Sequence, residues 1–103
     1  MLNSFVLVGK IKDLPEVKET SSGLRLASLI IEVERNFKNA DGIYEVDYFP
    51  LILWKGLAET TSEVAKIDDV IAVRGRVQTN RYESGNKVYH NHEFIVEKLS
   101  FIK

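Results

Sequence analysis

Residues 44–79 read YEVDYFPLILWKGLAETTSEVAKIDDVIAVRGRVQT. From Tyr44 to Trp54 the odd and even positions form two faces, both with large side chains, and from Val70 to Thr79 an apolar face alternates with a more polar one. Alternation is typical of β-strands, whose successive side chains point to opposite faces. Between these strands, from Gly56 to Lys66, apolar side chains recur at helical spacing. The stretch therefore predicts a strand, a helix and a strand, in that order.

Further strands are predicted on both sides of this stretch. Residues 2–11 are rich in Val, Leu, Ile and Phe, and a connection through Pro15 to Gly23 follows them. Apolar residues then alternate from Arg25 to Arg35, at Ala27, Leu29, Ile31 and Val33. After residue 79, Ser84-Gly85-Asn86 is typical of a hairpin turn, and the last apolar strand is Phe94 to Ile102.

The order of three strands, one helix and two strands predicts an all-β fold. We expect a five-stranded antiparallel Greek-key barrel of the OB-fold type, with its helix between the third and fourth strands. Closing the sheet removes edges that would otherwise be exposed. A length of 103 residues predicts a single domain over residues 1–103.

The composition excludes several classes of protein. With 45% hydrophobic and 28% charged residues, the chain is ordinary for a globular protein and not for a disordered one. The absence of cysteine rules out disulfides and a thiol nucleophile, and it suits the reducing cytoplasm. The longest apolar run, Phe49 to Trp54, is too short to cross a membrane. We expect a cytoplasmic protein that binds no membrane.

The charges are balanced overall but unevenly placed. The formal net charge is −1, so nothing attracts a polyanion globally. Residues 74–87, however, hold Arg74, Arg76, Arg81 and Lys87 against Glu83 alone. We expect a cationic stripe along this strand.

Large aromatic residues accompany that stripe. Tyr48 and Trp54 share one face of their strand, opposite the predicted core residues Phe49, Leu51 and Leu53. Binding of single-stranded nucleic acid requires exposed rings beside cations, because bases stack on the rings and cations neutralise phosphates. Phe37 and Tyr82 would widen this surface. The alternative is that the rings belong to the core or to an oligomer interface.

Several motifs, in order, resemble the bacterial and phage single-stranded DNA-binding proteins, the SSB family. They are Leu2 to Lys10 for the first strand, Arg35-Asn36-Phe37, Trp54 to Glu59 and Val73 to Tyr82. The resemblance covers nearly the whole chain and implies DNA binding and protection in replication, recombination and repair. It implies base stacking on Phe37, Tyr48, Trp54 and Tyr82. It also places along the DNA backbone the cations Lys10, Arg35, Lys55, Arg74, Arg76 and Arg81.

The resemblance also implies partners. It predicts a homo-oligomer, a tetramer or a dimer, formed by pairing of first strands, and a nucleoid-associated location. The apolar run Phe5 to Val8 fits a strand covered on both sides. Family members usually end in a flexible acidic tail that recruits replication and repair proteins, whereas this sequence stops at Lys103. Either a tail has been removed or the chain is a tailless relative.

No enzyme, metal site or cofactor is predicted. His90 and His92 share a strand face, but no third ligand is evident, so they are read as solvated residues. The sequence has no Walker-type glycine-rich loop and no base for a Ser or Thr nucleophile. Two other functions stay open: a protein-interaction module of a replication-restart complex with weak DNA binding, and the binding of RNA or oligosaccharide.

Overall fold

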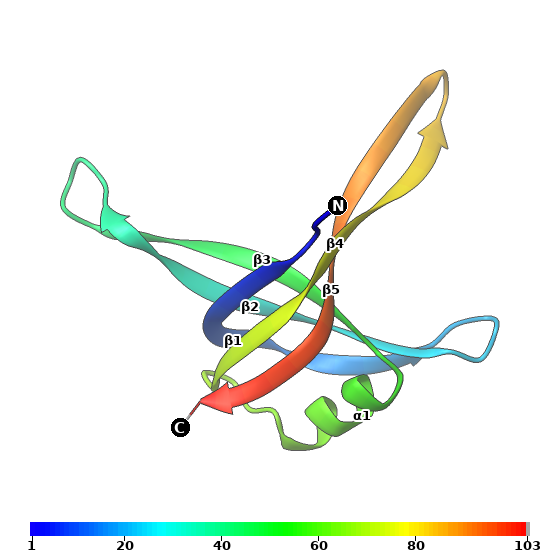
Figure 1. Cartoon of the computed structure of the whole chain (residues 1–103), viewed down its shortest axis with the longest axis horizontal. Coiled ribbons are helices and arrows are strands. Elements are labelled where there is room, and N and C mark those ends of the chain that lie inside the picture. Colours follow the sequence, from blue (N-terminus) through cyan, green and yellow to red (C-terminus); the bar gives the residue numbers. More distant parts are fainter. Residues whose placement is uncertain (103) are drawn as a thin grey trace.

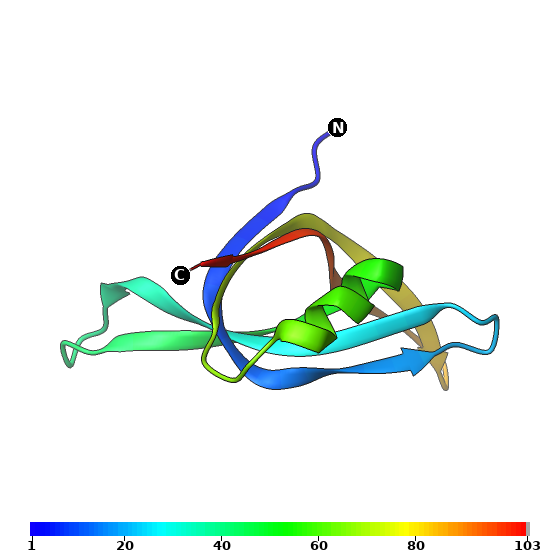
Figure 2. The same ribbon diagram turned by 90° about the horizontal axis from the view of Figure 1, so that it is seen from below.

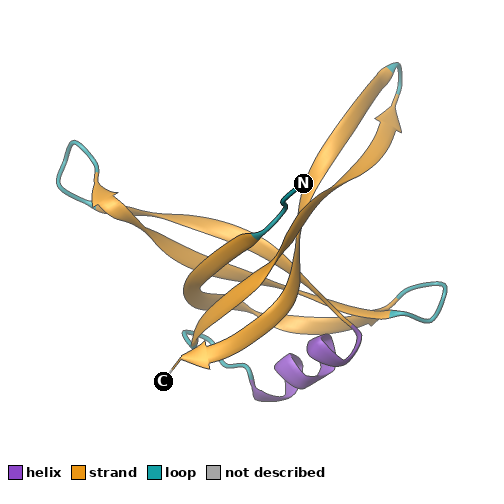
Figure 3. Cartoon of the chain, viewed as in Figure 1, coloured by secondary structure: helices purple, strands orange, loops and turns teal. Residues whose placement is uncertain are grey.

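The computed structural model describes residues 1–102, which form a β-barrel with one helix (Figures 1 and 3). The predicted order of elements is confirmed. The end of the predicted domain, Lys103, lies outside the described residues. In chain order the elements are β1 (Phe5–Glu19), β2 (Arg25–Lys38), β3 (Tyr44–Trp54), α1 (Lys55–Val64), β4 (Val70–Ser84) and β5 (Lys87–Ile102).

The barrel closes in the order β1-β2-β3-β5-β4, and β1 joins its two ends. Residues 5–10 of β1 pair with β4, and residues 10–19 pair with β2. β1 therefore extends to Glu19, past the predicted connection at Pro15, with register shifts between Ile11 and Glu16. One strand thus serves two neighbours in turn.

One pairing corrects the expectation of a wholly antiparallel barrel. β3 and β5 run parallel, with Leu51 opposite Phe94 and Ile52 opposite Ile95, whereas the other four pairings are antiparallel. The reason is topological. Directions cannot alternate all the way around a closed ring that has an odd number of strands, so one neighbouring pair must be parallel.

The core follows the predicted alternation. Inward positions on β2, β3 and β4 are fully or almost fully buried, while their neighbours in sequence face outward. Partly buried Phe5 and Phe49 both contact Phe94 edge-on, with ring centroids 5.4 and 5.5 Å apart. The buried hydrophobic side chains of these three strands are those of Ala27, Leu29, Ile31, Leu51, Leu53, Ile71 and Val73.

The helix lies across one opening of the barrel (Figure 2). Ala58 and Thr61 are buried, and Leu57 packs against the core. Val64, which the helical spacing placed on the buried face, is exposed because the helix ends there. α1 therefore covers the opening with one short face.

Each hairpin continues beyond the barrel wall as a two-stranded arm (Figure 1). We call residues 34–46 the β2–β3 arm and residues 78–93 the β4–β5 arm. The predicted turn at Ser84-Gly85-Asn86 forms the tip of the β4–β5 arm, where Gly85 has a φ of 63°. A positive φ is readily adopted by glycine because it has no Cβ. These two arms and the β1–β2 hairpin point in different directions from the barrel (Figure 1).

Candidate nucleic-acid interface

Tyr48 and Trp54 lie on the outer face of β3, as the alternation predicted. Their neighbours Phe49, Leu51 and Leu53 turn inward. Tyr48 is 57% exposed, and its hydroxyl donates a hydrogen bond to Glu32 Oε1 over 3.2 Å. Trp54 is partly buried. Both rings are therefore attached to the rigid barrel wall.

The other two predicted rings lie on the arms. Phe37 is 59% exposed on the β2–β3 arm, and Tyr82 is 45% exposed on the β4–β5 arm. The structure thus distributes the four rings over the barrel wall and two arms and does not gather them in one cluster. Tyr82 stacks on Tyr89, a ring that the sequence analysis did not select. The available signal was the position of Tyr89 directly across the hairpin from Tyr82.

Three of the predicted residues line one cavity on the outer surface. Trp54, Lys55 and Arg76 meet there over a floor formed by Ile95 and Val96. The cavity holds about 400 Å³. Leu24 and Glu97 complete the lining, so the cavity combines an aromatic ring, apolar side chains, two cations and one carboxylate. Rings and cations are the groups that bind single-stranded nucleic acid.

Three of the predicted cations form ion pairs. Arg76 lies 3.4 Å from Glu97, and Arg81 lies 2.9 Å from Glu83. Arg35 bonds two carboxylates, those of Asp47 and Glu45. The hydrogen bond from Arg35, together with its charge, lowers the pKa of the Asp47 carboxyl below its ordinary value. Within residues 1–102, no ion pair involves the remaining three, Lys10, Lys55 and Arg74.

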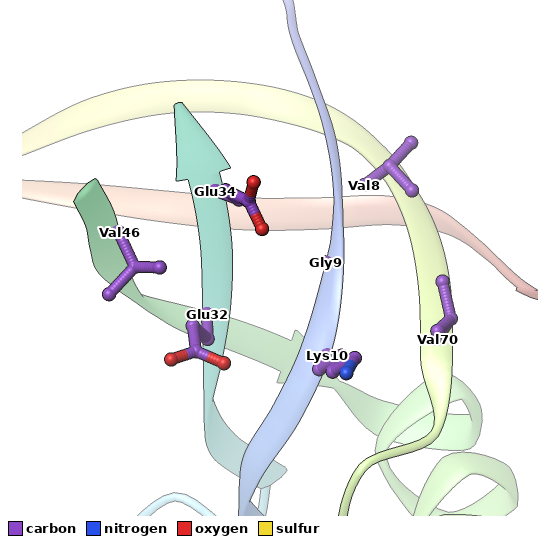
Figure 4. A pocket seen from close by; sticks show the side chains of 7 residues that line it. All are labelled: Val8, Gly9, Lys10, Glu32, Glu34, Val46 and Val70. Atoms are coloured by element: carbon purple, nitrogen blue, oxygen red, sulfur yellow. The ribbon is translucent and has the colours of Figure 1, made fainter. Parts of the chain in front are cut away.

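Lys10 lies apart from the cavity at Trp54. It lines a pocket where β1 and β2 diverge, together with Glu32 and Glu34 (Figure 4). Glu32 also forms an ion pair with Lys12, with 3.2 Å between Oε2 and Nζ. This part of the outer surface is therefore mixed in charge.

Arg74 is exposed on the outer face of β4, between β1 and β5. It pairs in register with Val6 on one side and Lys98 on the other. Val6 and Val8 are 67% and 49% exposed beside it. The outer face across β1, β4 and β5 thus presents two valines and two cations.

The two histidines lie on the β4–β5 arm, with His90 opposite Arg81 and His92 opposite Thr79. In the part of the chain that the structure describes, no group of three or more metal-ligating side chains gathers. No helix among residues 1–102 has the length and apolar character needed to cross a membrane.

Solved structures with the same fold include two proteins from the single-strand binding group. One is a Plasmodium falciparum SSB in complex with ssDNA, with a TM-score of 0.82, 14% identity, and coverage of 100% of this chain and 96% of that one. The other is a deletion mutant of the Thermus aquaticus single-stranded DNA binding protein. It has a TM-score of 0.82 at 20% identity and covers 99% of this chain and 51% of that one.

The sequence itself matches named relatives. Single-stranded DNA-binding protein 1 of Streptococcus pyogenes is 40% identical over all of this chain and 80% of that protein. The single-stranded DNA-binding protein of Enterococcus faecalis is 37% identical over 86% of this chain and 48% of that protein. The model of the single-strand binding protein family matches residues 2–102. This chain belongs to the single-strand binding protein family.

Proposed function

We propose that this chain binds single-stranded DNA with little regard to base sequence. The observation that carries the proposal is the cavity where Trp54, Lys55 and Arg76 meet. A base stacks on the ring, and the cations neutralise the adjacent phosphates. Each stacked base contributes about 1–3 kcal/mol. The names of the relatives and the DNA-bound Plasmodium falciparum structure support the same ligand.

The other rings extend the path of the strand. Tyr48 on the barrel wall and Phe37 and Tyr82 on the arms offer further stacking surfaces, so the DNA lies across the barrel and reaches both arms. Of the three cations without an ion pair within residues 1–102, Lys55 and Arg74 bind phosphate most readily, because Lys10 lies beside Glu32 and Glu34. Arg76 and Arg81 are exposed, and they exchange a carboxylate for a phosphate at little cost because exposed ion pairs are weak.

We further propose that the chain acts as a homo-oligomer, a tetramer or a dimer, in DNA replication, recombination and repair in the cytoplasm. Val6 and Val8 on the outer face of β1 support association through first strands, because exposed valines on a strand favour burial against a second copy. Contacts with replication and repair proteins are expected only where a tail follows this segment.

The fluorescence of the single tryptophan, Trp54, tests the proposal directly. We would titrate the protein with oligo-dT and with a duplex of equal length, at low and high salt. We expect quenching by the single strand and little by the duplex. The log-log dependence of affinity on salt should have a slope near −3, which corresponds to about four phosphates neutralised. A folded protein that responds to neither ligand would contradict DNA binding and favour a protein-interaction module.

A further inference from the structure

The β2–β3 arm has a break in its backbone pairing at Phe37. Glu34 pairs with Val46, and the next pair is Lys38 with Tyr44. Residues 35–37 of β2 therefore stand opposite the single residue Glu45. Such a bulge interrupts the ladder of hydrogen bonds and turns side chains in new directions. Backbone pairing alone does not fix the direction of Phe37.

The side chain of Arg35 bridges the two strands at this bulge. Its Nε and Nη2 donate to the two carboxylate oxygens of Asp47, over 3.0 and 2.9 Å. Its Nη1 donates to Glu45 Oε2 over 2.7 Å. Two parallel bonds from a guanidinium to a carboxylate define both distance and orientation. Arg35 thus joins β2 to β3 where backbone bonds are missing.

The same network reaches the turn at the tip of the arm. The second oxygen of Glu45 accepts a hydrogen bond from Asn39 Nδ2 over 3.1 Å. The Asn39 Oδ1 atom accepts from the backbone N–H groups of Asp41 and Ile43, over 2.9 and 3.0 Å. Hydrogen bonds therefore connect Asp47 to the turn through Arg35, which precedes Phe37 in the sequence, and Asn39, which follows it.

These bonds leave Arg35 poorly suited to hold phosphate. All three of its nitrogens already donate to carboxylates. One guanidinium faces two carboxylates, so the three groups together carry a net negative charge and repel a polyanion. An approaching phosphate would have to displace a bidentate bond, which is stronger than a single contact.

We infer that Arg35 is a positioning residue: it holds the bulge that presents Phe37 to DNA, and it does not bind phosphate itself. The inference rests on the proposed function, because it needs a strand of DNA for Phe37 to stack on. It departs from the role that family resemblance implies for this position. The arginine acts through Asp47 and Glu45, so their carboxylates become part of the DNA-binding surface although they are negative.

Whether Asp47→Ala raises or lowers the affinity for DNA distinguishes the two possible roles of Arg35. If Arg35 binds phosphate, Asp47→Ala frees the arginine and removes a negative charge, so affinity for oligo-dT rises. If Arg35 positions Phe37, Asp47→Ala releases the bulge and affinity falls, by about threefold, a fraction of the loss expected for one stacked base. Glu83→Ala is the matched control, because it frees Arg81 from an exposed ion pair on the other arm. It should raise affinity.

Two further measurements make the test decisive. Arg35→Ala should leave the salt slope unchanged, whereas loss of a phosphate contact lowers its magnitude by about 0.7. In a Phe37→Ala background, Asp47→Ala should cause no further loss of DNA affinity, because Asp47 acts only through Phe37. Each of three results would overturn the inference: tighter binding by Asp47→Ala, a reduced salt slope for Arg35→Ala, or additive losses of affinity in the double variant Phe37→Ala/Asp47→Ala.

A measurement without DNA keeps this test distinct from that of the proposed function. Amide hydrogen exchange at residues 35–43 should accelerate in Arg35→Ala, while exchange in the buried segments of β2 and β3 stays slow. Unchanged exchange in the arm would refute the positioning role even in a protein that binds DNA. If exchange accelerates in Arg35→Ala but the wild-type chain binds no DNA, the proposed function is refuted, while the structural role of Arg35 in the arm is confirmed.

Discussion

The ring of Tyr82 stacks on the ring of Tyr89, with 5.1 Å between centroids and 17° between planes. The pair lies across the β4–β5 arm, where the two residues are in register. One ring of a stacked pair covers part of the other and limits its rotation. Tyr89 therefore covers one face of the Tyr82 ring and leaves the other face for the proposed stacking of a base.

We expect Tyr89→Ala to weaken oligo-dT binding about fivefold, because a stacked aromatic pair contributes about 1 kcal/mol. Tyr89→Phe keeps the ring and should bind like the wild type. Fluorescence anisotropy of a labelled oligonucleotide measures both. Equal losses of affinity in Tyr89→Ala and Tyr89→Phe would show that the hydroxyl of Tyr89 matters for binding and that the stacked ring does not.

Removing the ring at the cavity should weaken binding on every sequence. Trp54→Ala is expected to lose about 1–3 kcal/mol of binding free energy on oligo-dT and oligo-dA alike. The same anisotropy assay applies, since the intrinsic reporter is gone. Ile67→Ala is the control, because Ile67 is an exposed residue between α1 and β4 and lines none of the cavities described above. Wild-type affinity in Trp54→Ala would remove this ring from the binding surface.

Two glycines should respond oppositely to alanine. A Cβ at Gly75 would overlap the carbonyl oxygen of Ile95, whereas a Cβ at Gly56 meets no atom within 4 Å. Gly75→Ala should therefore reduce the free energy of unfolding by more than about 3 kcal/mol. Gly56→Ala, in the first turn of the helix, should raise it by at most about 0.5 kcal/mol. Urea denaturation compares the two, and a stable Gly75→Ala variant would disprove the close approach of β4 and β5.

The bond between Arg35 and Asp47 should make stability depend on pH in acid. Arg35 lowers the pKa of Asp47 below its ordinary value of 3.8, so the bond stabilises the fold above that pH. The stabilisation is lost as the pH falls through the lowered pKa. We expect the melting temperature of Asp47→Asn to lie below that of the wild type at neutral pH.

This difference in melting temperature should shrink as the pH falls below about 4. Arg35→Met should show the same profile, because it removes the other partner of the bond. A difference that persists unchanged at low pH would mean that the carboxylate contributes by its shape and not by its charge.

The core could be predicted from the sequence because burial is encoded locally. Leu29 and Ile31, or Leu51 and Leu53, alternate with less buried neighbours, and the two-residue period of a strand turns one set inward whatever the strand pairs with. The outward direction of Tyr48 follows from the same period.

Other features depend on register and closure, which no local pattern contains. The partners of Arg35 could not be read from the sequence, because they follow from a bulge that sets residues 35–37 against Glu45. The parallel pairing of β3 with β5 follows from closing an odd-numbered ring. The stacking of Tyr82 on Tyr89 needed the position of the hairpin turn and the register on both sides of it.

The double role of β1 has a consequence for synthesis of the chain. Phe5 pairs with Gly75, and Lys10 pairs with Val70, so the first strand meets one of its two partners only after most of the chain exists. On a ribosome, β1 can form its hairpin with β2 early, because those residues are near in sequence. The ring itself cannot close until β5 has also left the exit tunnel, because β5 lies between β3 and β4. Until β4 pairs with β1, Val6 and Val8 belong to an unpaired strand edge, the kind of edge on which nascent chains aggregate.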